Sequence, residues 1–295
     1  MSFLQRFQQY VSAQQLFSPG DTLLLAVSGG IDSVVLCELC KQAGYTFIIA
    51  HCNFKLRGAE SERDAAFVQQ LAQNYSVPFL KKEFDTAEYA EKNKLSIQEA
   101  ARELRYGWFA ELLNPAIGNR QSAIDISAHC PLPSAFSTAH CPLPTALLTA
   151  HHLDDNIETM LMHFFRGTGI HGLRGMLPKQ GHLVRPLLFA RKQELKQFAT
   201  EHTLSWVEDS SNALDKYSRN YFRNQLIPLV QHIYPEAENN LANNVRRFAD
   251  MEQLYDQALA LHKKKLLEYK GEEVHIPILK LQKSEPLHSI VYEII

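Results

Sequence analysis

The first half of the chain alternates short apolar runs, which favour β-strands, with amphipathic runs, which favour helices. The expected strands are residues 22–27, 46–50, 78–84 and 146–150, and the expected helices are residues 31–43, 61–75 and 97–113. Strands separated by helices pair in parallel, because parallel neighbours need a long crossover connection. The alternation therefore predicts an α/β fold with a doubly wound, mainly parallel sheet. In such a sheet ligands bind beyond the carboxyl ends of the strands.

The second half of the chain has a largely helical pattern. The helices expected there are residues 191–202, 218–230 and 236–268. Pro228 and Pro235 are expected to break this pattern. We therefore expect one domain over residues 1–214, followed by a helical linker and a second, smaller domain over residues 215–295. The apolar run at residues 289–295 resembles a strand with no turn after it, which indicates a domain that continues further.

Residues 114–145 interrupt the alternation. The hexapeptide Ala-His-Cys-Pro-Leu-Pro occurs at residues 128–133 and again at residues 139–144. Its two His-Cys pairs are candidate metal ligands, but a short duplicated surface insertion is the simpler interpretation. Because prolines and small polar residues disfavour regular structure, we expect a flexible loop inserted between a helix and a strand.

Composition limits the classes of partner. The net charge of the 295 residues is −2, so no general basic field indicates nucleic acid. No apolar run approaches the roughly 20 residues that span a bilayer, and we expect a cytoplasmic protein without a membrane partner. Cys37 and Cys40 form a C-x-x-C pair that is typical of redox or metal sites. They lie one turn apart in an apolar run, where cysteine acts as a small hydrophobic residue, and we expect them in the core.

A glycine-rich loop lies between the first expected strand and helix. Its residues are Ser28, Gly29, Gly30, Ile31, Asp32 and Ser33. Two glycines let the backbone approach a phosphate closely, and the helix N-terminus offers free N–H donors. Asp32 would repel phosphate unless a bound Mg²⁺ reversed the sign of the interaction. The alternative is a simple turn in which Asp32 complements the helix dipole. We expect ATP at this loop, with Mg²⁺ on Asp32.

The loop lacks the Walker A and Rossmann spacings and resembles the SGGxDS loop of the PP-loop ATP pyrophosphatases. Further segments resemble the tRNA(Ile)-lysidine synthase family in the same order, over roughly residues 20–230. They are HCNFKLRG at residues 51–58, ARELRY at 101–106, AHHLDDNIET at 150–159, VEDSSN at 207–212, and Tyr217, Ser218, Arg219, Asn220 and Arg223. The insertion at residues 114–145 departs from the family pattern. The resemblance implies that ATP adenylates the wobble cytidine of an isoleucine tRNA with a CAU anticodon. Free L-lysine then attacks, and AMP and pyrophosphate are released.

The resemblance also implies roles for single residues. Catalysis would involve Asp32, Arg105, His152, Asp155 and Glu158, and ATP would contact His51 as well as the loop. Asp155 and Glu158 lie three positions apart in an expected helix and would hold the substrate lysine. The alternative for this acidic pair is to complement the helix dipole. A metal site at the same cluster lacks a further expected ligand.

A local basic stripe offers a place for RNA. Lys216, Arg219 and Arg223 would contact the tRNA backbone, and the alternative is a solvated charged face. Two other functions remain open. One is a different PP-loop tRNA-modifying enzyme, such as a tRNA thiolase, which needs working cysteines. The other is a nucleotide-gated tRNA-binding module without chemistry.

Overall fold

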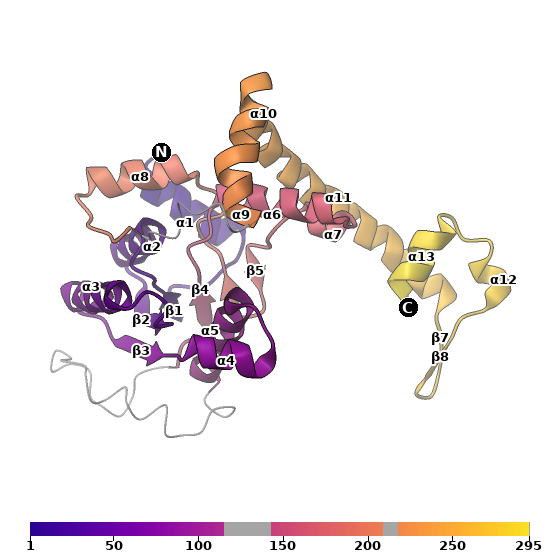
Figure 1. Cartoon of the computed structure of the whole chain (residues 1–295). Helices are drawn as coiled ribbons and strands as arrows, with labels where there is room; N and C mark the ends of the chain where they lie inside the picture. Colours follow the sequence, from indigo (N-terminus) through magenta and orange to yellow (C-terminus); the bar gives the residue numbers. More distant parts are fainter. Residues whose placement is uncertain (115–142, 209–217, 295) are drawn as a thin grey trace. The chain divides into compact units, whose positions relative to one another are not determined.

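The computed structural model describes residues 1–114, 143–208 and 218–294, which divide into two compact units (Figure 1). The first unit comprises Met1–Asn156 and Leu177–Lys216, and the second comprises Ile157–Met176 and Tyr217–Ile295. One boundary falls within helix α6 (Leu153–Arg166). The repeated His-Cys segment and Lys216 lie outside the described residues.

The first unit is built on a six-stranded sheet with the order β3-β2-β1-β4-β6-β5. The strands are β1 (Thr22–Ala26), β2 (Thr46–Asn53), β3 (Phe79–Glu83), β4 (Ala146–Leu148), β5 (Lys179–Gln180) and β6 (Leu183–Val184). All neighbours pair in parallel except β5 and β6. The predicted doubly wound, mainly parallel α/β fold is confirmed. The strand order reverses beside β1, so β1 and β4 flank the point where a ligand crevice is expected.

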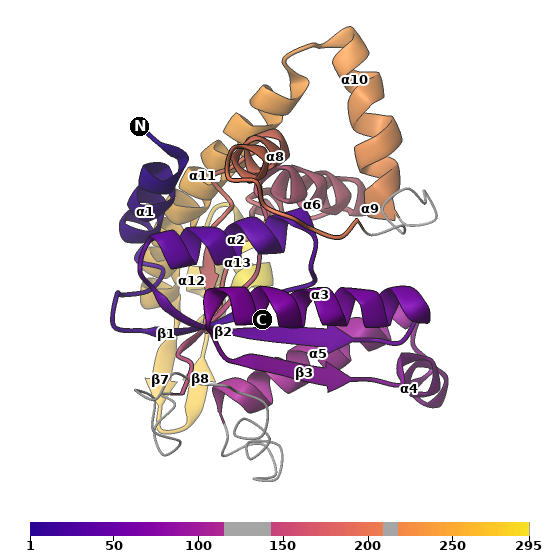
Figure 2. The same cartoon turned by 90° about the vertical axis from the view of Figure 1, so that its left-hand side faces the viewer.

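Helices cover both faces of this sheet (Figures 1 and 2). One face carries α1 (Phe3–Ala13), α2 (Ile31–Gln42), α3 (Ala59–Tyr75) and α8 (Lys192–Glu201), and the other carries α5 (Ile97–Leu113) with α4 (Thr86–Asn93) packed against it. Each face of the sheet packs into its own hydrophobic core, and the residues of β1 alternate between them. Leu23 and Leu25 belong to the core under α1, α2, α3 and α8, and Leu24 belongs to the core under α5. All three leucines are fully buried, each contributing about 1.5–3 kcal/mol.

Local signals placed α2, α3, α5 and α8 to within two residues of their observed ends, whereas α4 was not among the expected helices. Helix α5 begins and ends where the sequence predicted, and its capping box is present: Ser96 Oγ accepts from Glu99 N at 3.3 Å, and Glu99 Oε2 accepts from Ser96 N at 3.0 Å. Cys37 and Cys40 are fully buried in α2, as the core interpretation predicted. Burial raises the pKa of both thiols, so neither is a thiolate at neutral pH.

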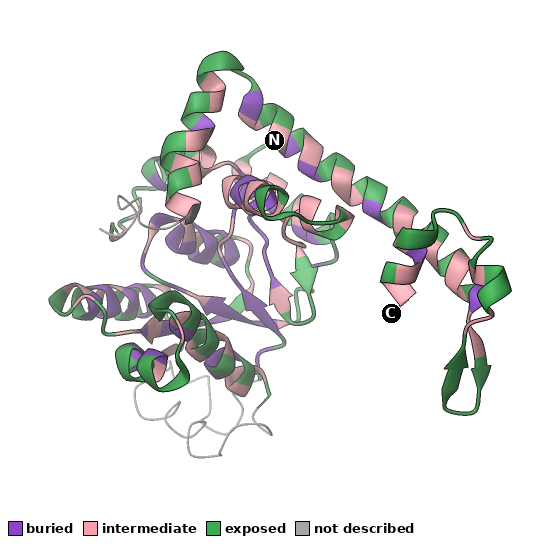
Figure 3. Cartoon of the chain, turned by 45° about the vertical axis from the view of Figure 1, so that its right-hand side comes forward, coloured by how far each residue is buried: buried purple, intermediate pink, exposed green. Residues whose placement is uncertain are grey.

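The second unit is helical apart from one short hairpin. Besides the end of α6 it contains α7 (Ile170–Leu173), α9 (Ser218–Tyr221), a π-helical turn (Phe222–Leu226), α10 (Ile227–Ile233), α11 (Ala237–Leu266), β7 (Glu268–Lys270), β8 (Glu273–His275), α12 (Ile278–Leu281) and α13 (Leu287–Ile294). Figure 3 shows buried residues spaced along α11 and none on the hairpin strands. No described helix is both long and apolar enough to cross a bilayer.

Two predictions for this unit were wrong. Pro228 does not break the helix: it lies at the start of α10, which continues directly from the π-helical turn at Phe222–Leu226, whereas Pro235 lies between α10 and α11 as predicted. The described part of the run expected at residues 289–295 is not a strand but belongs to helix α13 (Leu287–Ile294). Its apolar residues Leu287, Ile290, Val291 and Ile294 follow helical spacing. The prediction of a strand rested on the short apolar run alone, which fits either element.

Candidate active site

The glycine-rich loop connects β1 to the N-terminus of α2. Gly29 has φ = +93°, a conformation that favours glycine, and Gly30 is the N-cap residue of α2. A Cβ atom on Gly29 would lie 2.7 Å from Val207 Cγ2. Val207 N also donates to the Gly29 carbonyl at 3.0 Å. Val207 therefore contacts the loop at Gly29 and leaves no room there for a side chain.

Hydroxyl groups hold the loop's shape from within. Ser33 Oγ donates to the Gly30 carbonyl at 2.8 Å, and Gly30 N donates to Ser28 Oγ at 3.3 Å. Asp32 lies in the first turn of α2. The loop thus presents backbone N–H groups and a helix N-terminus, which together favour an anion.

A cavity of about 260 Å³ opens over this loop and the carboxyl ends of β1, β2 and β4. Its walls are formed by Ala26, Val27, Ser28, Gly30, Asp32, Ser33, Ala50, Cys52, Phe54, Arg105, Tyr106, Phe109, Thr149, Ala150 and His151. The lining combines polar side chains of the loop with three aromatic rings, those of Phe54, Tyr106 and Phe109. The combination suits a molecule with a phosphate end and a planar apolar end.

Arg105 lines this cavity, and its predicted role in catalysis stays a prediction. Its guanidinium carbon lies 5.2 Å from the centre of the Phe54 ring, within range of a cation–π interaction. Phe54 in turn stacks on Phe84, with ring centroids 5.5 Å apart. The aromatic pair supports a cation that reaches the cavity from α5.

His51 lies beneath the loop and is not among the lining residues. It is buried, and its Nδ1 lies 2.8 Å from the Val27 carbonyl, so Nδ1 carries the proton and donates. Burial lowers the pKa of His51, which keeps the ring neutral. The structure thus gives His51 a contact with the backbone that leads into the loop, and its contact with ATP stays a prediction.

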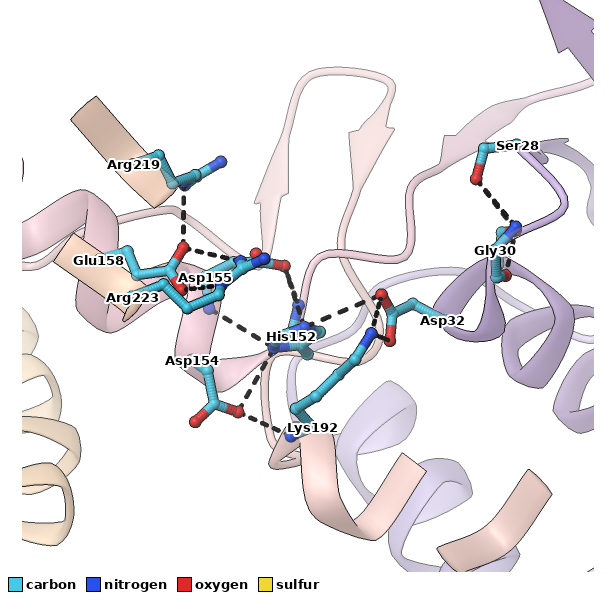
Figure 4. A network of polar contacts seen from close by, with 11 residues as sticks. Ser28, Gly30, Asp32, His152, Asp154, Asp155, Glu158, Lys192, Arg219 and Arg223 are labelled. Carbon is cyan, nitrogen blue, oxygen red and sulfur yellow. Dashed lines mark hydrogen bonds and ion pairs between the residues drawn. The ribbon is translucent and has the colours of Figure 1, made fainter. Parts of the chain in front are cut away.

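A second polar cluster of the first unit surrounds His152 (Figure 4). The buried imidazole lies between three carboxylates: Nδ1 is 3.4 Å from Asp154 Oδ2, and Nε2 is 3.5 Å from Asp155 Oδ2 and 3.9 Å from Asp32 Oδ2. Burial lowers the pKa of His152, but the hydrogen bond that its ring donates to Asp154 and the charges of Asp155 and Asp32 outweigh it and raise the pKa overall. The cluster therefore joins the loop to the start of α6.

Two basic residues at the start of α8 complete this cluster. Lys192 Nζ contacts both Asp32 carboxylate oxygens, at 2.6 and 2.7 Å, and Lys192 N donates to Asp154 Oδ2 at 2.6 Å. Arg191 Nε lies 2.8 Å from Asp154 Oδ1. Burial raises the pKa of Asp154, but His152, the Lys192 N–H and Arg191 together lower it to about 2. Sequence reasoning did not single out Lys192, because no local motif marks a lysine 160 positions from Asp32.

This cluster makes folding stability depend on pH. Because the folded-state pKa of His152 is raised, its stabilising contribution is complete below its unfolded pKa of about 6.5 and is lost as pH rises through the folded value. We therefore expect His152→Asn to lose more stability at about pH 5.5 than at about pH 8.5 in chemical denaturation. The control is His182→Asn, at an exposed position of the same unit. Equal losses at both pH values for His152→Asn would contradict the assignment.

In the second unit, Glu158 is enclosed by guanidinium groups. Its side chain is 2% exposed. Arg223 Nε lies 2.6 Å from Oε1 and Nη2 lies 2.9 Å from Oε2, a bidentate pair, and Arg219 Nε lies 3.2 Å from Oε2. Arg219 also contacts the Thr159 hydroxyl. The structure thus pairs one residue expected to hold lysine with two expected to contact tRNA, and those roles stay predictions.

The comparisons with known proteins agree with this geometry. A family model described as a PP-loop domain matches residues 2–120 and 136–230. A tRNA(Ile)-lysidine synthase of Bacteroides thetaiotaomicron is 38% identical over 267 residues, which are 90% of this chain and 57% of that protein. One of Petrotoga mobilis is 30% identical over 299 residues, which are 96% of this chain and 87% of that protein. This chain thus spans little more than half of the Bacteroides relative.

Among solved structures, a U34-tRNA thiolase of Methanococcus maripaludis has the same fold. Its TM-score is 0.56, at 15% identity, over 84% of this chain and 80% of that chain. At this identity the likeness concerns the fold alone.

Proposed function

Because this chain belongs to the tRNA(Ile)-lysidine synthase family, we propose that it is an ATP-dependent carbon–nitrogen ligase. It joins free L-lysine to the wobble cytidine of an isoleucine tRNA with a CAU anticodon. The observation that carries the proposal is the Gly29 loop, which opens into a cavity that also holds Asp32 and Arg105. That arrangement suits a nucleotide with its phosphates on the loop.

The first step activates the base. The cytosine carbonyl oxygen at carbon 2 attacks the α-phosphorus of ATP, the bond to the β-phosphate breaks, and pyrophosphate leaves. The loop N–H groups and Ser28 and Ser33 would hold the departing phosphates at the helix N-terminus. Arg105, on the cavity wall, would stabilise negative charge at the α-phosphate. Asp32 offers hard carboxylate oxygens in the cavity and would hold Mg²⁺, which would neutralise phosphate charge.

The second step forms the carbon–nitrogen bond. The lysine ε-amine attacks the same carbon 2, the carbon–oxygen bond breaks, and AMP leaves with its oxygen. Asp155 and Glu158, both on α6, would attract and orient the lysine side chain. When protonated, His152 beside Asp155 would limit the negative charge of this cluster. Arg219 and Arg223 would contact the tRNA backbone.

Pyrophosphate release from ATP tests this proposal. We expect release by the wild-type protein to require the CAU-anticodon isoleucine tRNA, and Asp32→Ala to lower the rate at least about 100-fold, since it removes the loop's only charged side chain. Binding of ATP that neither tRNA nor lysine alters would leave the loop assignment in place and remove the substrate assignment.

A thiolase reaction predicts a need for cysteine, and the described thiols do not suit it. Cys37 and Cys40 are buried in the core, and burial raises the pKa of Cys52, on the cavity wall, to about 12. We expect Cys37→Ala/Cys40→Ala and, separately, Cys52→Ala to keep lysine incorporation within about twofold. The core double variant is expected to lose about 1–2 kcal/mol of stability through lost packing. Loss of tRNA modification in a folded variant would favour the thiolase instead.

A further inference from the structure

Lys192 contacts both carboxylate oxygens of the loop acid Asp32, and His152 lies further away, with Nε2 3.9 Å from Oδ2. The Lys192 side chain is 36% exposed, and that of Asp32 is 29% exposed. The start of α8 is fixed separately, because Lys192 N donates to Asp154, which Arg191 also binds. The backbone of Lys192 is therefore anchored, while its long side chain retains access to solvent and to the loop.

The ion pair of Lys192 and Asp32 offsets a negative charge that would otherwise repel phosphate from the loop. A carboxylate at the mouth of an anion site repels phosphate, and among the described residues that line the cavity only Arg105 carries a permanent positive charge. A lysine ammonium beside the loop removes the repulsion and supplies a mobile cation. Its flexible stem lets it move from a carboxylate to a neighbouring phosphate oxygen without movement of α8.

We propose that Lys192 is a phosphate-binding residue of this site, which Asp32 holds in place until the nucleotide arrives. The proposal rests on the proposed function in one respect, that the cavity takes ATP. On binding, the ammonium exchanges Asp32 for an oxygen of the β- or γ-phosphate. The exchange would leave the Asp32 carboxylate available to hold Mg²⁺. No covalent bond changes in this step.

The test measures binding of ATP and of inorganic pyrophosphate by calorimetry, without tRNA or lysine. We expect Lys192→Gln to weaken both affinities about tenfold or more, and Lys192→Arg to stay within about threefold of wild type. The matched control is Lys196→Gln, one turn further along α8 at an exposed position. Thermal unfolding of each variant checks that the fold is intact. Unchanged affinity in folded Lys192→Gln would overturn the proposal.

A second pair of variants separates a direct contact from an effect through Asp32. If Lys192 touches phosphate, Lys192→Gln weakens pyrophosphate binding in an Asp32→Asn background too. If Lys192 only compensates the charge of Asp32, the same change has no effect there, and the proposal is wrong. Failure of the proposed function looks different. A wild-type protein that binds ATP but ignores lysine refutes the ligase and leaves Lys192 open to this test, whereas one that binds no ATP refutes both.

Discussion

Gly29→Ala is expected to lower ATP affinity at least about tenfold and to destabilise the first unit by about 2 kcal/mol. The φ of +93° at Gly29 is unfavourable for a residue with a Cβ atom, and that atom would lie 2.7 Å from Val207 Cγ2. Relief requires movement of either the loop or the Val207 segment, which are joined by a backbone hydrogen bond. Either movement displaces the N–H groups expected to hold phosphate. Calorimetry with ATP and chemical denaturation measure the two effects.

The matched control for this prediction is Gly20→Ala. Gly20 also lies in the first unit and has no positive φ, and a Cβ atom added there would meet no described atom within 4 Å. We expect the ATP affinity and stability of this variant to match those of wild type. Wild-type affinity in Gly29→Ala would mean that the loop does not hold the nucleotide through its backbone.

Glu158→Gln is expected to destabilise the second unit by about 2 kcal/mol and to reduce lysine-dependent turnover at least about 100-fold. The substitution leaves two guanidinium groups without the buried carboxylate that both contact. Removing one partner of a buried ion pair costs about 3–5 kcal/mol, and the lower value here reflects that both arginines are about one-third exposed. Urea denaturation and the rate of lysine incorporation measure the two effects.

Two further variants make this prediction specific. Glu272→Gln removes an exposed carboxylate of the same unit and is expected to change neither quantity. Arg223→Gln combined with Glu158→Gln is expected to cost less stability than the sum of the single changes, since both remove one interaction. Additive losses would show that the pair does not stabilise the unit.

The fold was predictable because its signals are local. Strands β1 and β2 are apolar runs followed by helical patterns, and the capping box of Ser96 and Glu99 marks the start of α5. Strands β5 and β6 have two residues each and carry no such signal. The strand expected at the end of the chain was wrong because a short apolar run fits both a strand and a helix. Ile290 of α13 is buried through packing within its own unit, which no local signal indicates.

The site was predictable only in part. The loop was found because its glycines, its hydroxyls and its position after a strand lie within six consecutive residues. Lys192 and Val207 reach the same loop from 160 or more positions away, and no spacing in the sequence connects them to it. The partners of Glu158 were likewise identified as basic residues, but their contact with it depends on how α6 and the segment at Arg219 pack within the second unit.

The most direct test of the central claim is transfer of labelled lysine to tRNA. Wild-type protein is incubated with ATP, labelled L-lysine and unmodified isoleucine tRNA bearing a CAU anticodon, with methionine tRNA bearing the same anticodon as the competitor. We predict label in the isoleucine tRNA, with one AMP and one pyrophosphate per lysine joined, and none with Asp32→Ala. Label-free tRNA in a reaction where the wild-type protein binds ATP and both substrates are present would contradict the assignment of this chain as a lysine-to-cytidine ligase.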